Sequence, residues 1–302
     1  MAVLVRSKVD RRARAGSRLA AALALVALVS PLAVHAQDWL ISIIEGDAVV
    51  IDGVRRYAAT AGQRLDAGAI VETATKTGLV RLEGSDQSTH DLGPDTRVML
   101  APAGFPFRNE RPPQIYLMQG WLKSTARGAR DAAGIVTPAI EVLPFKGSVV
   151  VQQQKREHMA FVEGGRIDVV ERRVGSGTIA VDTGQFYGAE GARRGSVAAR
   201  PAPAWLQTVP KSFRDPIPLR AQAWRDKRVD AGLLPGPTYA HLADWLTAEM
   251  TLRVHMPGRF GPLARDMAFR NEISSHMSAH PEWGPLIAEL NRPRRAASGA
   301  SR

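Results

Sequence analysis

GAIVETATKTGLVRLEGSDQSTHDLGPDTRVML, residues 68–100, contains three short apolar runs rich in branched residues. The runs cover residues 69–71, 79–82 and 97–100, and each is bounded by Gly, Asp, Thr or Pro. Branched side chains favour extended backbone, and the boundary residues favour turns. Short strands that recur roughly every ten residues are typical of all-β proteins. We therefore predict an all-β domain, built as a β-sandwich, a barrel or a β-coil of short strands.

The same texture continues on both sides of this stretch, so the predicted β domain covers residues 37–190. The other runs expected to form strands are residues 48–51, 115–118, 140–142, 148–151, 159–162 and 166–170. Between the last two runs, the pair Gly164-Gly165 predicts a two-residue hairpin turn, because glycine tolerates the positive φ that such turns need.

After this domain the composition changes twice. Residues 191–218 are rich in proline and predict a linker or an extended strap. Residues 219–290 predict a small α-helical module. Its clearest pattern is an apolar helical face at i, i+3, i+4 and i+8, made by Leu242, Trp245, Leu246 and Met250. Thr238 and Asp266 are expected to cap the starts of two helices. Residues 291–302 are basic and rich in small residues, which predicts a disordered tail.

The first 36 residues have the three parts of a secretory signal peptide. A basic stretch, residues 1–18, precedes the apolar run at 19–29, and Val34-His35-Ala36 offers a signal-peptidase site. The run is shorter than the ~20 apolar residues of a membrane span, and no later stretch is long enough. We expect cleavage after Ala36, export to the periplasm and a mature protein with no membrane span. The chain has no cysteine, which excludes a lipoprotein, disulfides and thiolate metal sites.

The charge of the chain argues against a nucleic-acid partner. Residues 1–36 hold six basic side chains and one acidic one, so the formal net charge of +11 falls to +6 without them. A nucleic-acid interface needs a basic stripe interleaved with aromatic residues, and the sequence shows none. Contact with an acidic envelope surface fits this mild excess of positive charge.

The order of the residues between and within the strands resembles FecR-like domains, the periplasmic modules named for a ferric-siderophore signalling protein. The resemblance covers residues 45–187 and is carried, in chain order, by Gly62, Leu65, Gly68, Ile70, Thr73, Leu92-Gly93-Pro94, Thr96, Val98, Leu100, Leu117, Gly120, Thr137-Pro138, Val142, Gly147-Ser148, Val162, Glu163-Gly164, Ile167, Val169 and Gly184-Gln185. The chain departs from the family pattern at Gly68-Ala69, at Glu83-Gly84-Ser85 and at an insertion of residues 87–91.

The resemblance implies a periplasmic β domain that binds another component of the bacterial envelope. Membrane-spanning signalling members of this family carry a cytosolic sigma-regulator segment before a transmembrane helix, whereas this chain has a predicted signal peptide. Anti-sigma activity is therefore not transferred to it. The helical module lies outside the resemblance and is assigned to no family.

No set of residues predicts a catalytic, cofactor or metal site, so the leading expectation is a non-enzymatic protein that binds a protein partner or relays a signal in the envelope. An exposed strand edge or the Pro-rich loop 101–113 would recruit the partner by strand addition. Trp205, Trp224 and Trp283 are the candidate partner-contacting residues, because tryptophan is enriched at interface hot spots. Core packing is the competing interpretation, above all for Trp245.

Two alternatives stay open. The first is an accessory protein that binds peptidoglycan or an exported polysaccharide through its tryptophans and its basic charge. The second is a metal-dependent hydrolase, because Glu272, His276 and His280 have the i, i+4, i+8 spacing of one helix face. The remaining histidines are expected to be surface or turn residues; they are His90, His158, His241 and His255.

Overall fold

The computed structural model describes residues 39–109, 112–127, 133–172 and 177–292. The predicted signal peptide, residues 1–36, lies outside these residues, as do residues 293–302 of the predicted tail. In the described part of the chain, no helix combines the length and the apolar composition needed to cross a membrane.

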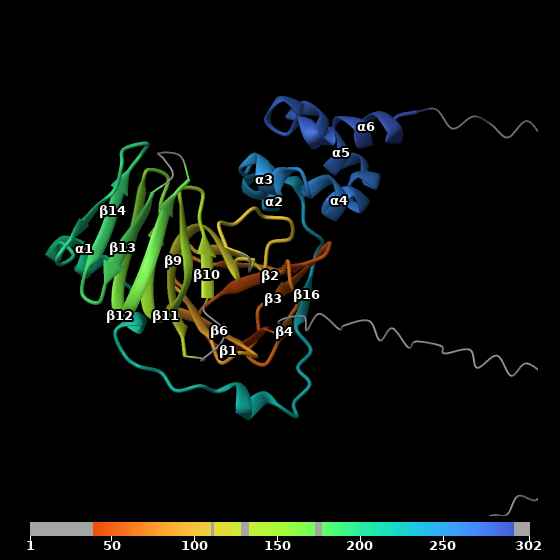
Figure 1. Ribbon diagram of the computed structural model, residues 1–302. Helices are drawn as coiled ribbons and strands as arrows, with labels where there is room; N and C mark the ends of the chain where they lie inside the picture. The colour runs from red at the N-terminus through yellow and green to blue at the C-terminus, as the bar shows by residue number, and fades with distance from the viewer. Residues whose placement is uncertain (1–38, 110–111, 128–132, 173–176, 293–302) are drawn as a thin grey trace, which may run out of the picture. The chain divides into compact units, whose positions relative to one another are not determined.

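The described chain is a β domain followed by a small group of helices (Figure 1), which confirms the predicted fold class. The strands are β1 (Trp39–Glu45), β2 (Ala48–Asp52), β3 (Arg55–Ala58), β4 (Arg64–Leu65), β5 (Ile70–Thr73), β6 (Leu79–Gly84), β7 (Thr89–Leu92), β8 (Arg97–Leu100), β9 (Ile115–Ala126), β10 (Ala133–Val136), β11 (Ile140–Gln153), β12 (Glu157–Glu171), β13 (Thr178–Asp182), β14 (Phe186–Glu190), β15 (Ser196–Ala198) and β16 (Gly232–Leu234). The α-helices are α1 (Pro203–Thr208), α2 (Tyr239–Leu246), α3 (Met250–Arg253), α4 (Met256–Phe260), α5 (Met267–Ser275) and α6 (Gly284–Leu290).

The sheet folds back on itself along three long strands, β9, β11 and β12. The first half of β9 pairs with β8, and its second half pairs with β7. In the same way, β12 pairs with β14 in its first half and with β13 in its second half, while β11 runs beside it. The result is two layers, and their inward-facing apolar side chains form one central core.

Glycine occupies the bend of each long strand. Gly120, Gly147 and Gly165 have φ angles of +98°, +117° and +84°. A Cβ atom at Gly147 would lie 2.0 Å from the carbonyl oxygen of Gly164, and one at Gly165 would lie 2.1 Å from that of Lys146. At Gly147 and Gly165 the paired strands β11 and β12 lie so close together that only glycine fits. The chain passes from one layer to the other at these bends.

The predicted hairpin turn at Gly164-Gly165 is therefore wrong. Both residues lie inside β12, which is continuous from Glu157 to Glu171. The turn between β11 and β12 lies at residues 154–156 instead, where the amide of Gln154 donates to the carbonyl of Glu157 over 2.8 Å. A glycine with positive φ occurs both in turns and in bent strands. The Gly164-Gly165 pair alone therefore could not distinguish a turn from a bend.

Each layer is covered over part of its outer face. The layer that contains β2, β5, β8 and the first half of β9, which we call the helix layer, shares an apolar cluster with α2–α6. The other layer contains β1, β6, β7 and the second half of β9. We call it the strap layer, because residues 199–231, the strap, cross its outer face and contribute Trp205 and Phe213 to a third apolar cluster. Strands buried on both faces explain the dense apolar runs of the sequence.

The segment after the strap differs from the helical prediction for residues 219–290. Residues 221–224 form one 3₁₀ turn, and β16 pairs antiparallel with β3 at the edge of the helix layer. Regular helices begin at Tyr239, directly after Thr238 as predicted. Of the predicted apolar face, Leu242, Trp245 and Leu246 are buried in α2, but α2 ends at Leu246. Met250 consequently starts a new helix and is 65% exposed.

Candidate interaction surfaces

Polar side chains of the strap layer hold the strap by its main chain. The guanidinium of Arg81 donates to the carbonyl of Ile217 over 2.7 Å. The carboxylate of Glu83 accepts from the amides of Arg220 and Ala221 at 2.8 and 2.9 Å. The Lys123 ammonium donates to the carbonyl of Phe213 over 2.5 Å. These charged side chains lie on the outer face of the strap layer. Backbone groups of the strap take the place of the water molecules that the side chains would otherwise bind.

Arg81 is fixed in this role by a buried partner. Its guanidinium makes a two-bond contact with the Asp91 carboxylate, at 2.6 and 2.7 Å, and both side chains are almost fully buried. A forked contact of this kind sets the orientation of the guanidinium plane. Asp91 belongs to the insertion of residues 87–91, which forms most of β7. The segment of residues 87–91 therefore contributes to holding the strap.

Trp205 is an internal anchor of the strap. Its side chain is 7% exposed, and its ring centroid lies 4.8 Å from Phe186 and 5.6 Å from Trp121. The indole N–H donates to the Oε1 atom of Gln152 over 2.7 Å. The ring of Trp205 and its N–H thus contact other residues of this chain, and almost none of the ring is left exposed for a partner.

Trp283 and Trp224 are also occupied inside the chain, to different degrees. Trp283 has 0% exposure in the cluster beneath the helices, with its ring 6.0 Å from that of Phe269. Trp224 is half-buried: it lies against Gly62, and the Lys227 ammonium sits 5.0 Å from its ring centroid. Of the three candidate tryptophans, only Trp224 has a ring that is partly accessible. Because Trp205 and Trp283 are buried, little aromatic surface is left for a sugar ring, which weakens the glycan-binding alternative.

The proposed metal-binding helix face is not formed. α5 ends at Ser275, and His276 has φ −110° and ψ 22°, outside the helix. His276 stacks on Tyr239 with centroids 5.1 Å apart, whereas the buried His280 contacts the Tyr239 hydroxyl at 3.2 Å through Nε2. Glu272 and His276 stay in contact, with the carboxylate 3.7 Å from Nδ1, but His280 is buried and bonds the Tyr239 hydroxyl instead of joining them. Within the described ranges, no group of three or more His, Asp or Glu side chains is placed to hold a metal ion.

The expectation for two of the other histidines is also wrong, because they are buried. His90 has 0% exposure and lies between Trp39, 5.0 Å away by ring centroids, and the Ser124 hydroxyl, 2.9 Å from Nδ1. Burial lowers its pKa to about 4, although the nearby Asp86 acts in the opposite direction. His158 is buried and bonds through Nδ1 to the Oε1 atom of Gln153 over 3.1 Å.

One long sheet edge carries no partner strand. β13 pairs with β12 along one side, and within the described residues no strand pairs with its other side. The strand reads Thr178-Ile179-Ala180-Val181-Asp182 and contains neither proline nor lysine. Ile179 and Val181 face the central core, so Thr178, Ala180 and Asp182 lie on the opposite face.

The other edge strands are short or lie near proline. β4 has two residues, and β15 and β16 have three each. Pro235 follows β16 directly, and Pro201 comes three residues after β15. Short edges and proline are the common means by which proteins prevent strand addition. β13 is consequently the edge most open to a partner strand.

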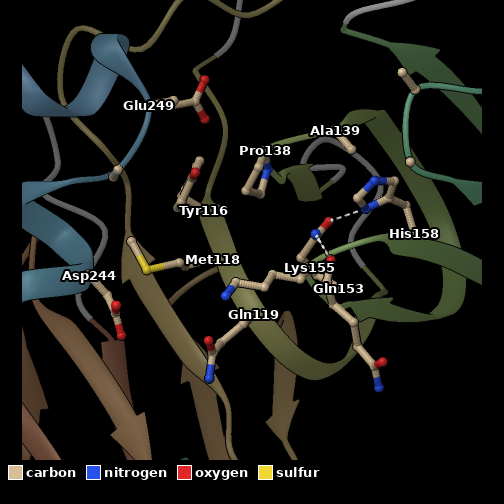
Figure 2. Close-up of a pocket in the computed structure, with 14 residues that line it drawn as sticks. Tyr116, Met118, Gln119, Pro138, Ala139, Gln153, Lys155, His158, Asp244 and Glu249 are labelled. Atoms are coloured by element: carbon tan, nitrogen blue, oxygen red, sulfur yellow. Dashed lines mark hydrogen bonds between the residues drawn. The ribbon is translucent and has the colours of Figure 1, made fainter. Parts of the chain in front are cut away.

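A cavity of about 380 Å³ lies where the helices meet the sheet (Figure 2). Its walls come from β9, the loop before β11, the β11–β12 turn, the residues after β14, and α2–α3. Met118, Pro138 and Ala139 supply apolar surface, and Gln119 and Lys155 supply polar groups. None of these residues belongs to the candidate sites taken from the sequence, because they are brought together only by the folded sheet.

The comparisons with known proteins are limited. No family model matches the chain, and no curated protein matches it. Two crystal structures of a "putative anti-sigma factor" from Parabacteroides distasonis ATCC 8503 align with 46% of the chain, at 15% and 14% identity and a TM-score of 0.35 in both cases. The aligned part spans 64% and 65% of those two chains. At this degree of overlap the comparison carries no argument about function.

Proposed function

We propose that this chain is an exported, non-enzymatic interaction module of the bacterial envelope that recruits a protein partner by strand addition at β13. The observation that carries the proposal is the open, proline-free edge of that strand. A partner strand would pair its main chain with this edge, and its side chains would meet Thr178, Ala180 and Asp182 on the outward face. Periplasmic export is part of the proposal and rests on the signal-peptide pattern of residues 1–36.

Two further features support a protein partner. The order of motifs resembles FecR-like domains, which are envelope signalling modules. The helices and the strap already cover much of the two outer faces, whereas the outward side chains Thr178 and Asp182 of β13 stay exposed. On β13 itself the exposed Asp182 lies 3.9 Å from Arg166 of β12, and its carboxylate would favour a partner strand that carries a basic side chain.

The test is site-specific crosslinking in cells of the source bacterium. A photoreactive residue at Thr178, which is exposed on β13, is compared with one at Ser196, which is exposed on β15. We expect one envelope protein to be captured from position 178 in the periplasmic fraction. The Ala180→Lys substitution places a charge on the edge and should abolish that adduct.

Ala198→Lys is the matched control, because it places the same charge on the exposed strand β15. It should leave the adduct from position 178 unchanged. Equal loss with both variants, or adducts only from position 196, would refute binding at β13. Recovery of the protein in the cytoplasmic fraction alone would refute the export part of the proposal.

A further inference from the structure

The cavity between the helices and the β11–β12 turn has an unbalanced charge. Two carboxylates lie in its wall, and each has an arginine partner: Asp244 pairs with Arg97, and Glu249 pairs with Arg172 at 2.6 Å. The ammonium of Lys155, by contrast, makes no hydrogen bond or ion pair that the described residues show. The cavity therefore presents one uncompensated positive charge to a ligand.

The position of Lys155 is set by the fold. It lies within the β11–β12 turn, which is closed by the Gln154 amide on the Glu157 carbonyl. Figure 2 shows its side chain directed into the cavity, toward Met118 and Gln119 of β9. Lys155 is exposed, and the turn between the two long paired strands places its backbone at the rim of the cavity, within reach of a ligand there.

Beside the ammonium, the cavity offers an apolar wall and the amide oxygen of Gln119. Met118, Pro138 and Ala139 form the apolar wall. Gln119 donates through Nε2 to the Asp95 carbonyl over 3.3 Å, which leaves its Oε1 atom facing no donor in the described chain. An amide acceptor next to a cation and an apolar surface matches the end of a peptide: a carboxylate, one apolar side chain and one main-chain N–H.

A sugar is a poorer match for this cavity. Carbohydrate rings bind on open aromatic faces, whereas Tyr116, the one aromatic residue in the wall, is 1% exposed. Its ring packs instead against Phe105 and Trp245, with centroids 5.5 and 6.4 Å away. The cavity wall therefore has no exposed aromatic face on which a sugar ring could stack. It offers a ligand a cation beside an apolar surface.

From this geometry we infer that the cavity binds the free carboxyl terminus of a peptide with an apolar last side chain, with Lys155 pairing the carboxylate and the Met118–Pro138–Ala139 wall receiving the side chain. The inference deepens the proposed protein-binding function by adding a second contact. The cavity is formed by elements other than β13. The cavity proposal and the β13 proposal are therefore tested with different residues and different measurements.

The experiment is an NMR titration of the purified, isotope-labelled protein with three probes. They are N-acetyl-leucyl-leucine with a free carboxylate, the same dipeptide as its C-terminal amide, and N-acetylmuramic acid, which carries its carboxylate on a sugar. We expect saturable shifts around residues 116–119 and 153–158 with the free acid, and a dissociation constant about tenfold higher for the amide, because a charge-assisted contact is lost.

Lys155→Gln should raise the dissociation constant of the free acid to that of the amide and leave the amide unaffected. Lys76→Gln removes the same charge from an exposed turn elsewhere and should change neither constant. Equal affinity for acid and amide, tighter binding of N-acetylmuramic acid, or no saturable shift with the dipeptide acid would each overturn the proposal. Loss of crosslinking at β13 leaves these outcomes unaffected, so failure of one proposal is distinguishable from failure of the other.

Discussion

At the scale of single residues, the structure contains a histidine that titrates far from neutrality. His90 is fully buried beside Trp39 and Ser124, and burial lowers its pKa to about 4. In the unfolded chain the same side chain has a pKa near 6.5. Between these two values the unfolded state binds the proton and the folded state does not, so the free energy of unfolding falls as the pH drops below about 6.5.

We expect His90 to lower the free energy of unfolding by about 2 kcal/mol between pH 7 and pH 5, since each unit of pKa difference corresponds to about 1.4 kcal/mol. Urea unfolding at the two pH values measures the change. The variant His90→Gln keeps a group able to bond Ser124 but does not titrate, so its loss should be smaller by that amount. His255→Gln, at an exposed position, should retain the full pH dependence of the parent protein; a parent-like slope in His90→Gln would contradict the assignment.

The sequence did not reveal this burial. A single histidine between polar neighbours carries no periodicity, and its partner Ser124 lies 34 residues further along the chain. The same limit applied to the tryptophans. Trp205 and Trp283 were identified as candidates for partner contact from residue type alone, whereas their surroundings, Gln152 and Phe186 for Trp205, come from distant strands.

At the scale of the elements, the bent strands depend on glycines with crowded surroundings. Gly165→Ala should destabilise the fold by about 3 kcal/mol or more, because the residue has φ +84° and the new Cβ would meet the Lys146 carbonyl oxygen at 2.1 Å. Gly164→Ala is the matched control, because nothing lies within 4 Å of its Cβ position. Its free energy of unfolding should stay within about 0.5 kcal/mol of the parent value.

Chemical denaturation of the two variants measures this difference. Equal stability of Gly164→Ala and Gly165→Ala would mean that the strand does not bend at residue 165. Local pattern predicted β2, β5, β6 and β8, where branched residues lie between turn formers, but not the short strands β3, β4, β7, β10 and β13–β16. Glycine occurs both at bends and at turns, and for this reason β11 and β12 were each predicted as two separate strands.

At the scale of the whole molecule, the helices and the β domain share one apolar core. Trp245 of α2 is fully buried against the helix layer, and its indole N–H donates to the Glu72 carboxylate of β5 over 2.7 Å. Arg259 of α4 donates to the carbonyls of Gly68 and Ile51. Contacts of this kind join elements far apart in the sequence, so we expect helices and strands to unfold in one transition.

Trp245→Phe should lower the free energy of unfolding by about 2 kcal/mol, because the Glu72 carboxylate loses its donor. The loss should appear equally in far-ultraviolet circular dichroism, which follows the helices and strands, and in tryptophan fluorescence. Trp224→Phe removes a half-buried indole for which the described chain shows no hydrogen bond, and should cost less than about 1 kcal/mol. Separate transitions for the two signals would show that the helical module is independent.

By itself the sequence determined the fold class, the positions of β2, β5, β6, β8, β9, β11 and β12, and the two helix starts after Thr238 and Asp266, because these depend on composition and on short-range periodicity. Only the tertiary structure decided what each polar or aromatic residue does. It buried Trp205, Trp283 and His90, attached the strap to Arg81, Glu83 and Lys123, left β13 as the open edge and formed the cavity around Lys155. The physical reason is that burial and hydrogen-bond partnership arise between residues distant in sequence, once the sheet folds on its glycines.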